Sequence, residues 1–275
     1  MRIHKQALDD LYTTLNRREL VHPDPLETLY AYPEPRDREI VGLVAASLSY
    51  GRVKSILASV HTLLDRMPAP ARFLAQATPA SLAATFAGFR HRFATGDQMA
   101  ALLVGAKALI ERHGSLHACF LAHFAPTHRT VVPALTGFAT ELRQAAGGMD
   151  THLLPCPSRG SACKRLNLFL RWMVRHDAVD PGGWSGVPPA ALVVPLDAHM
   201  RRICTALGFT RRKTPDLRAA LEITDAFRQF APTDPVRYDF ALTRLGIRPD
   251  TDLDAFLARW ADPPSPRLRR ASPSE

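Results

Sequence analysis

The sequence has few cysteines, and their spacing is not that of a metal site. The chain holds four, Cys119, Cys156, Cys163 and Cys204, without CxxC pairs and without a histidine cluster that would complete a zinc site. The closely spaced C-terminal quartet that holds an iron–sulfur cluster is also missing. We therefore predict four free thiols in a reducing compartment, with no metal and no cofactor.

Long apolar runs and an export signal are missing as well. The longest apolar run, near Ile40 to Leu48, is too short to span a bilayer. The segment from Met1 to Asp10 is polar and lacks the apolar core of a secretory signal. These features predict a cytoplasmic protein with no membrane partner.

Residues that alternate between apolar and polar, as in β-strands, are rare. Apolar residues instead recur at helical spacing, Ala and Leu are abundant, and most of the 23 prolines fall between candidate helices. We expect Asp37 to cap the helix that follows it. The pattern predicts an all-α fold with helices at 5–18, 37–50, 53–67, 70–76, 79–86, 97–113, 115–123, 132–146, 162–176, 197–207, 215–230, 235–245 and 251–260.

The chain length of 275 residues allows a substantial core. We expect residues 1–262 to form a single helical domain in two lobes, with a hairpin and the chemically important segment at 155–208. Residues 263–275 are rich in Pro, Ser and Arg and predict a disordered basic tail. No internal repeat or coiled-coil heptad is visible, and we expect a monomer.

Acidic residues are fewer than basic ones. Lys and Arg number 35 against 26 Asp and Glu, which gives a formal net charge of +9. A charge of this sign favours a polyanionic partner, and nucleic acid is the usual one. An excess of Arg that serves no ligand fits the same composition.

Lys164 is the residue best placed for covalent chemistry. Gly160 and Ser161 form a turn that leads into its helix, and backbone N–H groups at such a helix start suit a phosphate. Lys164 lies in the first turn with Leu168 four residues later, at the edge of the apolar stripe. Desolvation there favours a neutral amine that can attack carbon and form a Schiff base. A lysine that extends its charge to water, or contacts a phosphate, fits the same pattern.

Asp197 stands immediately before another helix, after Pro195 and Leu196. In this position a carboxylate can cap the helix by accepting a backbone N–H. Capping also fixes a carboxylate rigidly at a helix end, where it can face a substrate. The two roles are therefore compatible.

The segment VVPLDAHMRRICTALGF resembles the hydrophobic–Pro–hydrophobic–Asp–x–His helix start of the helix-hairpin-helix DNA glycosylase superfamily, which includes endonuclease III. In that superfamily the Asp is the catalytic carboxylate, and a lysine in the helix after the hairpin marks members that also cleave the abasic strand. The resemblance gives these roles to Asp197 and Lys164, and it places His199 at the substrate. Lys164 and Asp197 are 33 residues apart (197 − 164), a separation that looks closest to that in the archaeal 8-oxoguanine glycosylase branch.

The segment EIVGLVAASLSYGRVKSILASV looks like the first core helix of that superfamily and the turn that faces the lesion. Tyr50 and Arg52 are accordingly expected to fill the gap left by the flipped base or to grip its partner, although Tyr50 also suits packing at a helix end. The hairpin reads Pro-Ser-Arg-Gly-Ser where the superfamily usually has Leu-Pro-Gly-Val-Gly. The chain further resembles an uncharacterised family of bacterial proteins with this core, in ACKRLNLFLRWMVR, PLDAHMRRI, EITDAFRQF and DPVRYDFALTRLGI.

The resemblance also implies groups that hold the DNA. Gly160, Ser161, Arg165 and Arg201 are expected at the DNA backbone. Asp239 is a candidate for hydrogen bonding to the base edge, with a surface salt bridge to an Arg as the alternative.

Aromatic residues offer further candidates for contacts with DNA. The run from Phe89 to Phe93 interleaves basic and aromatic residues, as nucleic-acid surfaces do. It also fits a core edge with both Phe rings inside and both Arg side chains outside. Trp172 and Trp184 could stack on a base, although Trp172 fits the core better.

These features predict a base-excision repair enzyme for double-stranded DNA that contains a damaged base or an abasic site. The expected activity is that of a DNA glycosylase with AP-lyase action, on an oxidised purine such as 8-oxoguanine. A non-catalytic DNA-binding module on the same scaffold is one alternative. A helical protein-interaction domain whose charge is incidental is another.

Overall fold

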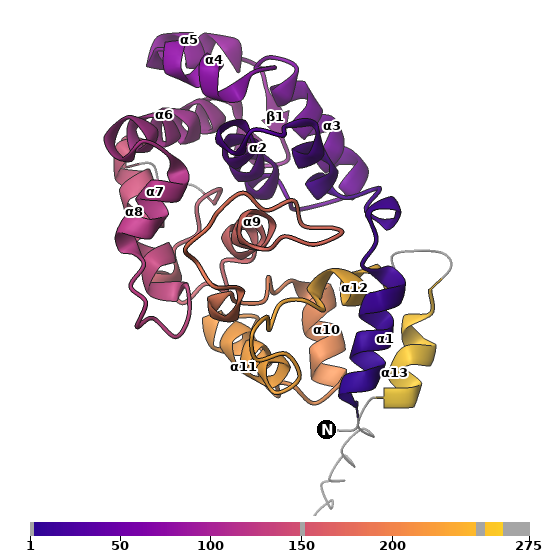
Figure 1. Cartoon of the computed structure of the whole chain (residues 1–275). Coiled ribbons are helices and arrows are strands. Elements are labelled where there is room, and N and C mark those ends of the chain that lie inside the picture. The colour runs from indigo at the N-terminus through magenta and orange to yellow at the C-terminus, as the bar shows by residue number, and fades with distance from the viewer. Residues whose placement is uncertain (1–2, 149–151, 246–250, 261–275) are drawn as a thin grey trace, which may run out of the picture.

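The computed structural model describes residues 3–148, 152–245 and 251–260 (Figure 1). The prediction of an all-α fold is confirmed, since helices make up nearly all regular structure in these ranges. One short antiparallel hairpin was not predicted: β1 (Arg90–His91) pairs with β2 (Ala94–Thr95). No helix within these ranges is long and apolar enough to cross a bilayer. The expected disordered tail, 263–275, lies outside the described residues.

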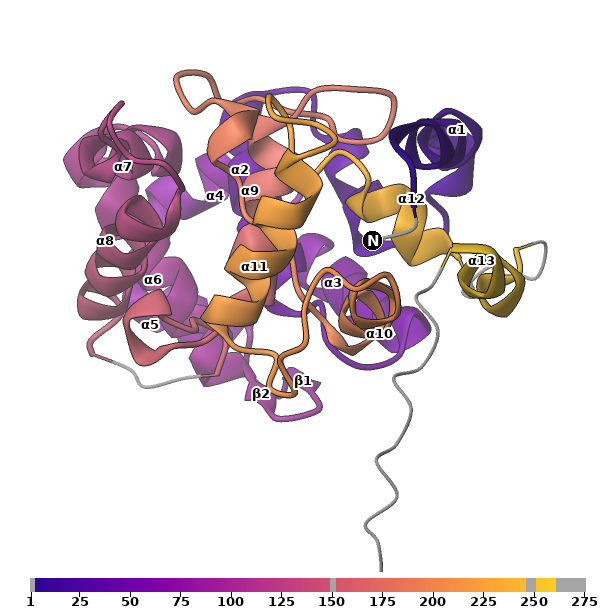
Figure 2. The same ribbon diagram turned by 90° about the horizontal axis from the view of Figure 1, so that it is seen from below.

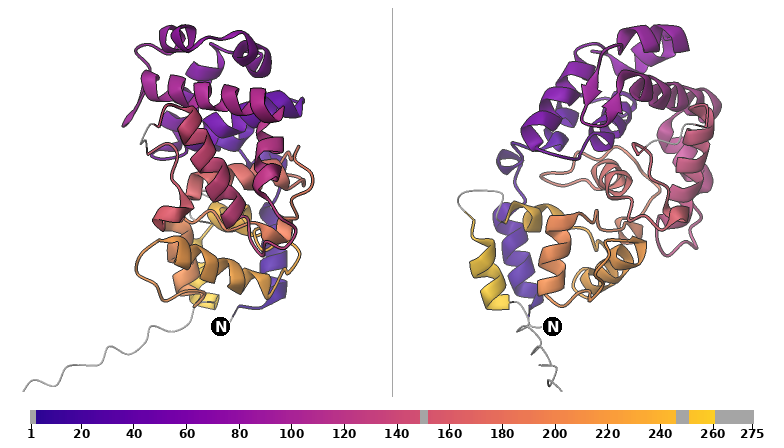
Figure 3. Two further views of the ribbon diagram at one scale, coloured as in Figure 1. Left: turned by 90° about the vertical axis from the view of Figure 1, so that its left-hand side faces the viewer. Right: turned by 180° about the vertical axis from the view of Figure 1, so that it is seen from behind.

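The helices form two groups: Figure 1 shows one above and to the left of α9 (Lys164–Val174) and the other below it. Both views of Figure 3 show the same division. The first group contains α2 (Pro35–Ser47), α3 (Val53–Leu64), α4 (Pro70–Gln76), α5 (Pro79–Thr85), α6 (Gly96–His113), α7 (Leu116–His123) and α8 (Val132–Ala145).

The second group joins the two ends of the described chain. It contains α1 (Lys5–Leu15), α10 (Ala198–Ala206), α11 (Leu217–Arg228), α12 (Asp239–Arg244) and α13 (Leu253–Trp260). The Tyr238 hydroxyl donates to Asp9 Oδ1 at 2.7 Å, which ties α1 to the start of α12. Seen from below, α1 and α13 lie on the side opposite to α6, α7 and α8 (Figure 2).

Helix α9 is buried along most of its length, from Leu166 to Val174. It packs closely against α2, where Gly42 permits the approach. A β-carbon at Gly42 would lie 3.2 Å from the ring of Phe169. The chain segment that carries Lys164 is therefore fixed by packing against α2.

Short 3₁₀-helices punctuate the loops between the helices. Three begin at a proline, whose fixed φ suits the first position of a helix. Those three are η2 (Pro25–Ala31), η3 (Pro157–Arg159) and η4 (Pro189–Ala191), whereas η1 (Arg18–Leu20) begins at an arginine.

Several helix starts differ from the prediction, and two of them show why. Asp37 does not cap its helix, which begins two residues earlier at Pro35; its carboxylate instead accepts from the Ala71 N–H at 2.7 Å and joins α2 to α4. The helix predicted at 235–245 begins only at Asp239. The preceding backbone makes turn hydrogen bonds, from Arg237 N to Asp234 O and from Asp239 N to Val236 O.

The run from Phe89 to Phe93 forms the β1–β2 hairpin. Phe89 is buried, but Phe93 is 72% exposed, so the expectation that both rings point inward is wrong. Arg92, at the turn, has a φ of 53°. The tight turn therefore reverses the chain and leaves Phe93 at the surface.

Candidate active site

A cavity of about 540 Å³ lies between the two groups of helices, beside α9. It brings together five of the residues predicted from sequence: Lys164, Asp197, Asp239, Tyr50 and Arg165. Its other walls are Pro23, Asp24, Pro25, Ser49, Gly51, Val53, Ile56, Leu168, Arg171, Pro195, Leu196, Thr243 and Arg244.

The turn before α9 aims Lys164 into this cavity. Gly160 has a φ of 76°, a conformation that glycine adopts without strain, and Ser161 forms a bridge to Asp216. Cys163, which precedes the helix, has a φ of 46°. This left-handed residue changes the direction of the chain immediately before Lys164. Helix α9 therefore begins at Lys164, two residues later than predicted, and Lys164 lies in its first turn as expected.

The amine of Lys164 is held at the end of α2. Its Nζ donates to the carbonyl of Ser49 at 3.3 Å, and the side chain is partly buried. Burial lowers the pKa of the ammonium, and the negative charges of Asp197, Asp24 and Asp239 oppose this shift without cancelling it. Lys164 therefore loses its proton more readily than a lysine in water.

Asp197 caps α10 as predicted. Its Oδ1 accepts from the N–H of Met200 at 2.9 Å, which fixes the carboxylate at the helix start. The carboxylate is partly exposed and lines the cavity with Pro195 and Leu196. Within the described ranges the Met200 N–H is its single hydrogen-bond donor, so the carboxylate keeps capacity for a ligand.

Asp239 is buried rather than at the surface, since its exposed fraction is 3%. One oxygen accepts a hydrogen bond from Arg171 on α9, whereas Oδ1 has no partner in the described part of the chain. Burial raises the pKa of Asp239 to about 6, although the Arg171 guanidinium opposes the shift. The surface salt bridge considered for this residue is thus a buried ion pair beside the cavity.

Arg171 belongs to a buried network of ion pairs. Its guanidinium also contacts Asp180 at 3.0 Å, and Asp180 pairs in turn with Arg175. Both arginine side chains are only 4% exposed. Arg171 therefore positions Asp239 from α9, the helix that also carries Lys164.

We expect Arg171→Leu to lower the free energy of unfolding by about 3–5 kcal/mol, because it leaves Asp239 buried without its partner. Urea denaturation measures this loss. Arg129→Leu is the control, since it removes an exposed pair with Asp225 and should cost less than about 1 kcal/mol. Equal effects of the two substitutions would show that the buried network does not stabilise the fold.

Tyr50 and Arg165 form one wall of the cavity. The Tyr50 hydroxyl donates to the carbonyl of His91 at 3.0 Å and contacts His152 Nε2 at 2.9 Å. The Arg165 guanidinium lies 5.1 Å from the centre of the Tyr50 ring and donates to the carbonyl of Ser47 at 2.9 Å. These contacts hold both side chains in place at the cavity edge.

The other predicted site residues lie outside the cavity lining. Arg52 is exposed at the start of α3, and Gly160 is exposed in the turn before α9. Arg201 donates to the carbonyl of Lys213 at 3.3 Å. His199, on the first turn of α10, has a buried Nε2 without a partner among the described residues.

Neither predicted stacking tryptophan reaches the cavity. Trp172 is fully buried in the core, in agreement with the alternative considered for it. Trp184 is also buried, and its indole N–H donates to Glu39 at 3.1 Å. Both are therefore excluded as stacking partners for a base in this arrangement.

Three charged residues of the cavity were not predicted from the sequence: Asp24, Arg171 and Arg244. Arg171 is seven residues after Lys164, on the same helix face, so the helical period could have identified it. Asp24 and Arg244 pair at 2.7 Å from opposite ends of the chain, and no local pattern predicts their contact. A further group, able to hold a metal ion, lies away from this cavity on α6, α7 and α8.

The fold and the cavity define an all-α protein whose internal polar site holds a lysine and three carboxylates. Residues 24–248 match the family described as Protein of unknown function (DUF2400), and the chain belongs to that family. No curated protein and no solved structure matches the chain.

Proposed function

We propose that this protein is a DNA glycosylase with AP-lyase activity that acts on an oxidised purine such as 8-oxoguanine. The observation that carries the proposal is the shared cavity of Lys164 and Asp197. One residue supplies an amine that burial makes easier to deprotonate, and the other supplies a carboxylate fixed by a helix cap. This pair suits nucleophilic attack at a carbon that develops positive charge.

In the proposed reaction the damaged nucleotide leaves the duplex and enters the cavity. The lone pair of Lys164 Nζ forms a bond to C1′ as the bond from C1′ to the base breaks, and the departing base takes up a proton. Opening of the sugar ring gives a protonated imine. Loss of a proton from C2′ then expels the 3′ phosphate, and hydrolysis of the imine restores the lysine.

Asp197 and Asp239 have separate roles in this proposal. The Asp197 carboxylate stabilises positive charge on the sugar as the base departs. Asp239 presents its unpartnered Oδ1 near the cavity, where it can accept from a donor on the base or, when protonated, donate. His199 is assigned to the substrate only because it follows Asp197 in the Asp–x–His sequence.

Exposed basic groups support a DNA partner. Arg52 lies next to the cavity residues Gly51 and Val53, and Arg211 and Lys213 are exposed in the loop after α10. Such groups neutralise phosphates, so binding should weaken steeply as salt is added. Binding without this salt dependence would favour the protein-interaction alternative.

The proposal predicts that strand cleavage at a preformed abasic site accelerates as pH rises. The reactive form of Lys164 is the neutral amine, and its pKa lies below the ordinary value of 10.5. Single-turnover rates should rise with pH and level off at a midpoint below that value. Lys164→Gln provides the baseline at each pH, and a rate that is flat or falls with pH contradicts the assignment.

The experiment that tests the function is release of the damaged base from duplexes that differ only in one nucleotide. Duplexes with 8-oxoguanine, uracil or an abasic site distinguish the outcomes. Release of 8-oxoguanine followed by strand cleavage supports the proposal. Salt-dependent binding without base release or cleavage on any duplex would overturn it and favour a non-catalytic DNA-binding module.

A further inference from the structure

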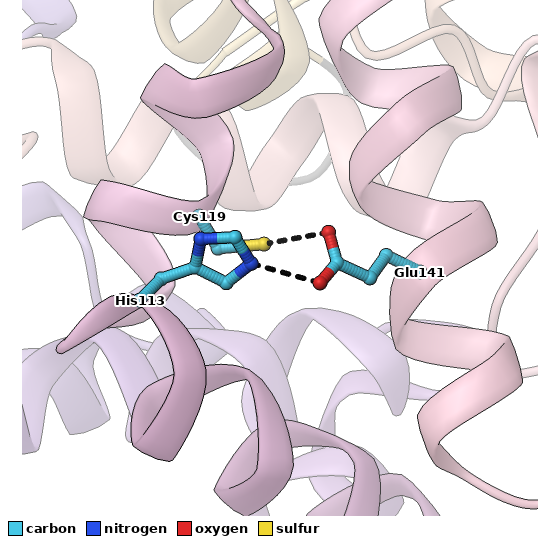
Figure 4. Close-up of side chains that lie close together, drawn as sticks. All are labelled: His113, Cys119 and Glu141. Carbon is cyan, nitrogen blue, oxygen red and sulfur yellow. Dashed lines mark hydrogen bonds and ion pairs between the residues drawn. The ribbon is translucent and has the colours of Figure 1, made fainter.

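A second cluster of reactive side chains lies among α6, α7 and α8 and takes no part in the cavity. His113, Cys119 and Glu141 each present a donor atom, and these three atoms lie within 4.8 Å of one another. Figure 4 shows the three side chains converging from separate helices. His113 Nε2 is 2.8 Å from Glu141 Oε1, and Cys119 Sγ is 3.7 Å from Glu141 Oε2.

A fourth donor stands at the same carboxylate. His123 Nε2 lies 2.9 Å from Glu141 Oε2 at the end of α7, outside the set of three donor atoms that lie within 4.8 Å of one another. Gly137 lies on α8, one turn before Glu141, and faces this ring. A β-carbon at Gly137 would lie 2.5 Å from Nδ1 of His123. Glycine weakens a helix interior, and here it makes room for the His123 ring.

The donor set has the chemistry of a particular class of ion. Two imidazole nitrogens, one thiol sulfur and one carboxylate oxygen match the ligands of zinc, which binds four such groups in a tetrahedron. Calcium and magnesium prefer oxygen ligands alone, so they fit this set poorly. Four protein ligands leave no open position for a substrate, which is typical of a structural site.

The Glu141 carboxylate lies at the centre of the cluster. His113, His123 and Arg112 all contact its oxygens. Arg112 contacts Oε1 at 2.6 Å from the surface, where 61% of its side chain is exposed. When an ion binds, the Arg112 guanidinium can keep its contact with Oε1 or move into solvent.

We propose that His113, Cys119, His123 and Glu141 form a structural zinc site that ties α6, α7 and α8 together. Cys119 is fully buried and would bind as the thiolate, releasing its proton to solvent as the ion enters. The site is independent of the proposed glycosylase activity, because none of its residues lines the cavity.

Cobalt titration of the full-length protein, after treatment with a chelator, tests the site directly. A thiolate-to-cobalt charge-transfer band and the visible bands of tetrahedral cobalt should appear and saturate at one equivalent, and zinc should displace them. Wild-type protein without these bands overturns the proposal and leaves the cluster as a hydrogen-bonded network. This readout needs no variant that has to fold.

Variants then assign the ligands. Cys119→Ser should abolish the thiolate band and weaken zinc binding at least about 100-fold in competition with a chelating dye. His123→Asn alters a partly exposed side chain and should weaken binding at least about 10-fold. Cys204→Ala changes a buried cysteine on α10, and Lys164→Gln changes the cavity; both should bind zinc as the wild type does. Unchanged binding in both Cys119→Ser and His123→Asn contradicts the assignment.

Thermal melting gives an independent readout of the structural role. Zinc should raise the melting temperature of the wild type in proportion to the logarithm of its concentration, because the folded state alone presents all four ligands. The same addition should raise the melting temperature of Cys119→Ser by much less, because its binding is expected to be at least about 100-fold weaker. A shift of the same size in both proteins would indicate nonspecific binding and would reject the site.

Discussion

Lys164→Gln is expected to abolish strand cleavage at an abasic site, with a loss of at least about 1,000-fold, while duplex binding persists. Glutamine cannot form an imine, so the covalent route is closed entirely. Its amide can still donate to the carbonyl of Ser49, the present partner of the lysine. Single-turnover cleavage and fluorescence anisotropy on the same duplex separate chemistry from binding.

Lys107→Gln is the matched control for this substitution. Lys107 is also partly buried and donates to backbone carbonyls, those of Leu74 and Ala75, but it lies outside the cavity. It should cleave at the rate of the wild type. Cleavage that survives in Lys164→Gln, or that is lost equally in Lys107→Gln, removes Lys164 from the role of nucleophile.

The second large effect is expected from Asp197→Asn, which should slow base release by roughly 100- to 1,000-fold. Asparagine caps a helix about as well as aspartate, so the bond from the Met200 N–H is retained and the fold is preserved. The negative charge that would stabilise the developing cation is lost. Base release, followed by alkaline strand scission, reports this step separately from lyase action.

Asp216→Asn distinguishes catalysis from capping. Asp216 caps α11 through the Ala219 N–H at 2.8 Å, as Asp197 caps α10, and it does not line the cavity. Its substitution should leave base release unchanged. Near-normal release in Asp197→Asn, or equal losses in the two variants, would reduce Asp197 to a helix cap.

The helices were predictable because their signals are local. Apolar spacing and the prolines placed them, and Asp197 and Ser115 act as N-caps in the structure. Helix ends were less predictable, because the free backbone N–H groups of a first turn can be bonded by a side chain from another helix. Asp37, for example, bonds to the start of α4 rather than to its own helix.

The candidate site was predictable where its residues lie in one segment. Lys164 and Asp197 could be selected from their own helix starts, and the cavity brings them together. Its remaining wall depends on contacts between distant segments, such as Asp24 with Arg244. The donor cluster on α6, α7 and α8 escaped notice for the same reason, because Glu141 is far along the chain from Cys119.

The central claim, that Lys164 forms a covalent imine with an abasic sugar, is tested most directly by borohydride trapping on a duplex with a preformed abasic site. Reduction converts the imine into a stable amine, so a trapped complex migrates as a covalent protein–DNA adduct. We expect an adduct with wild type and with Lys107→Gln, and none with Lys164→Gln. An adduct that persists in Lys164→Gln, or its absence from wild-type protein that binds the duplex, would contradict the claim.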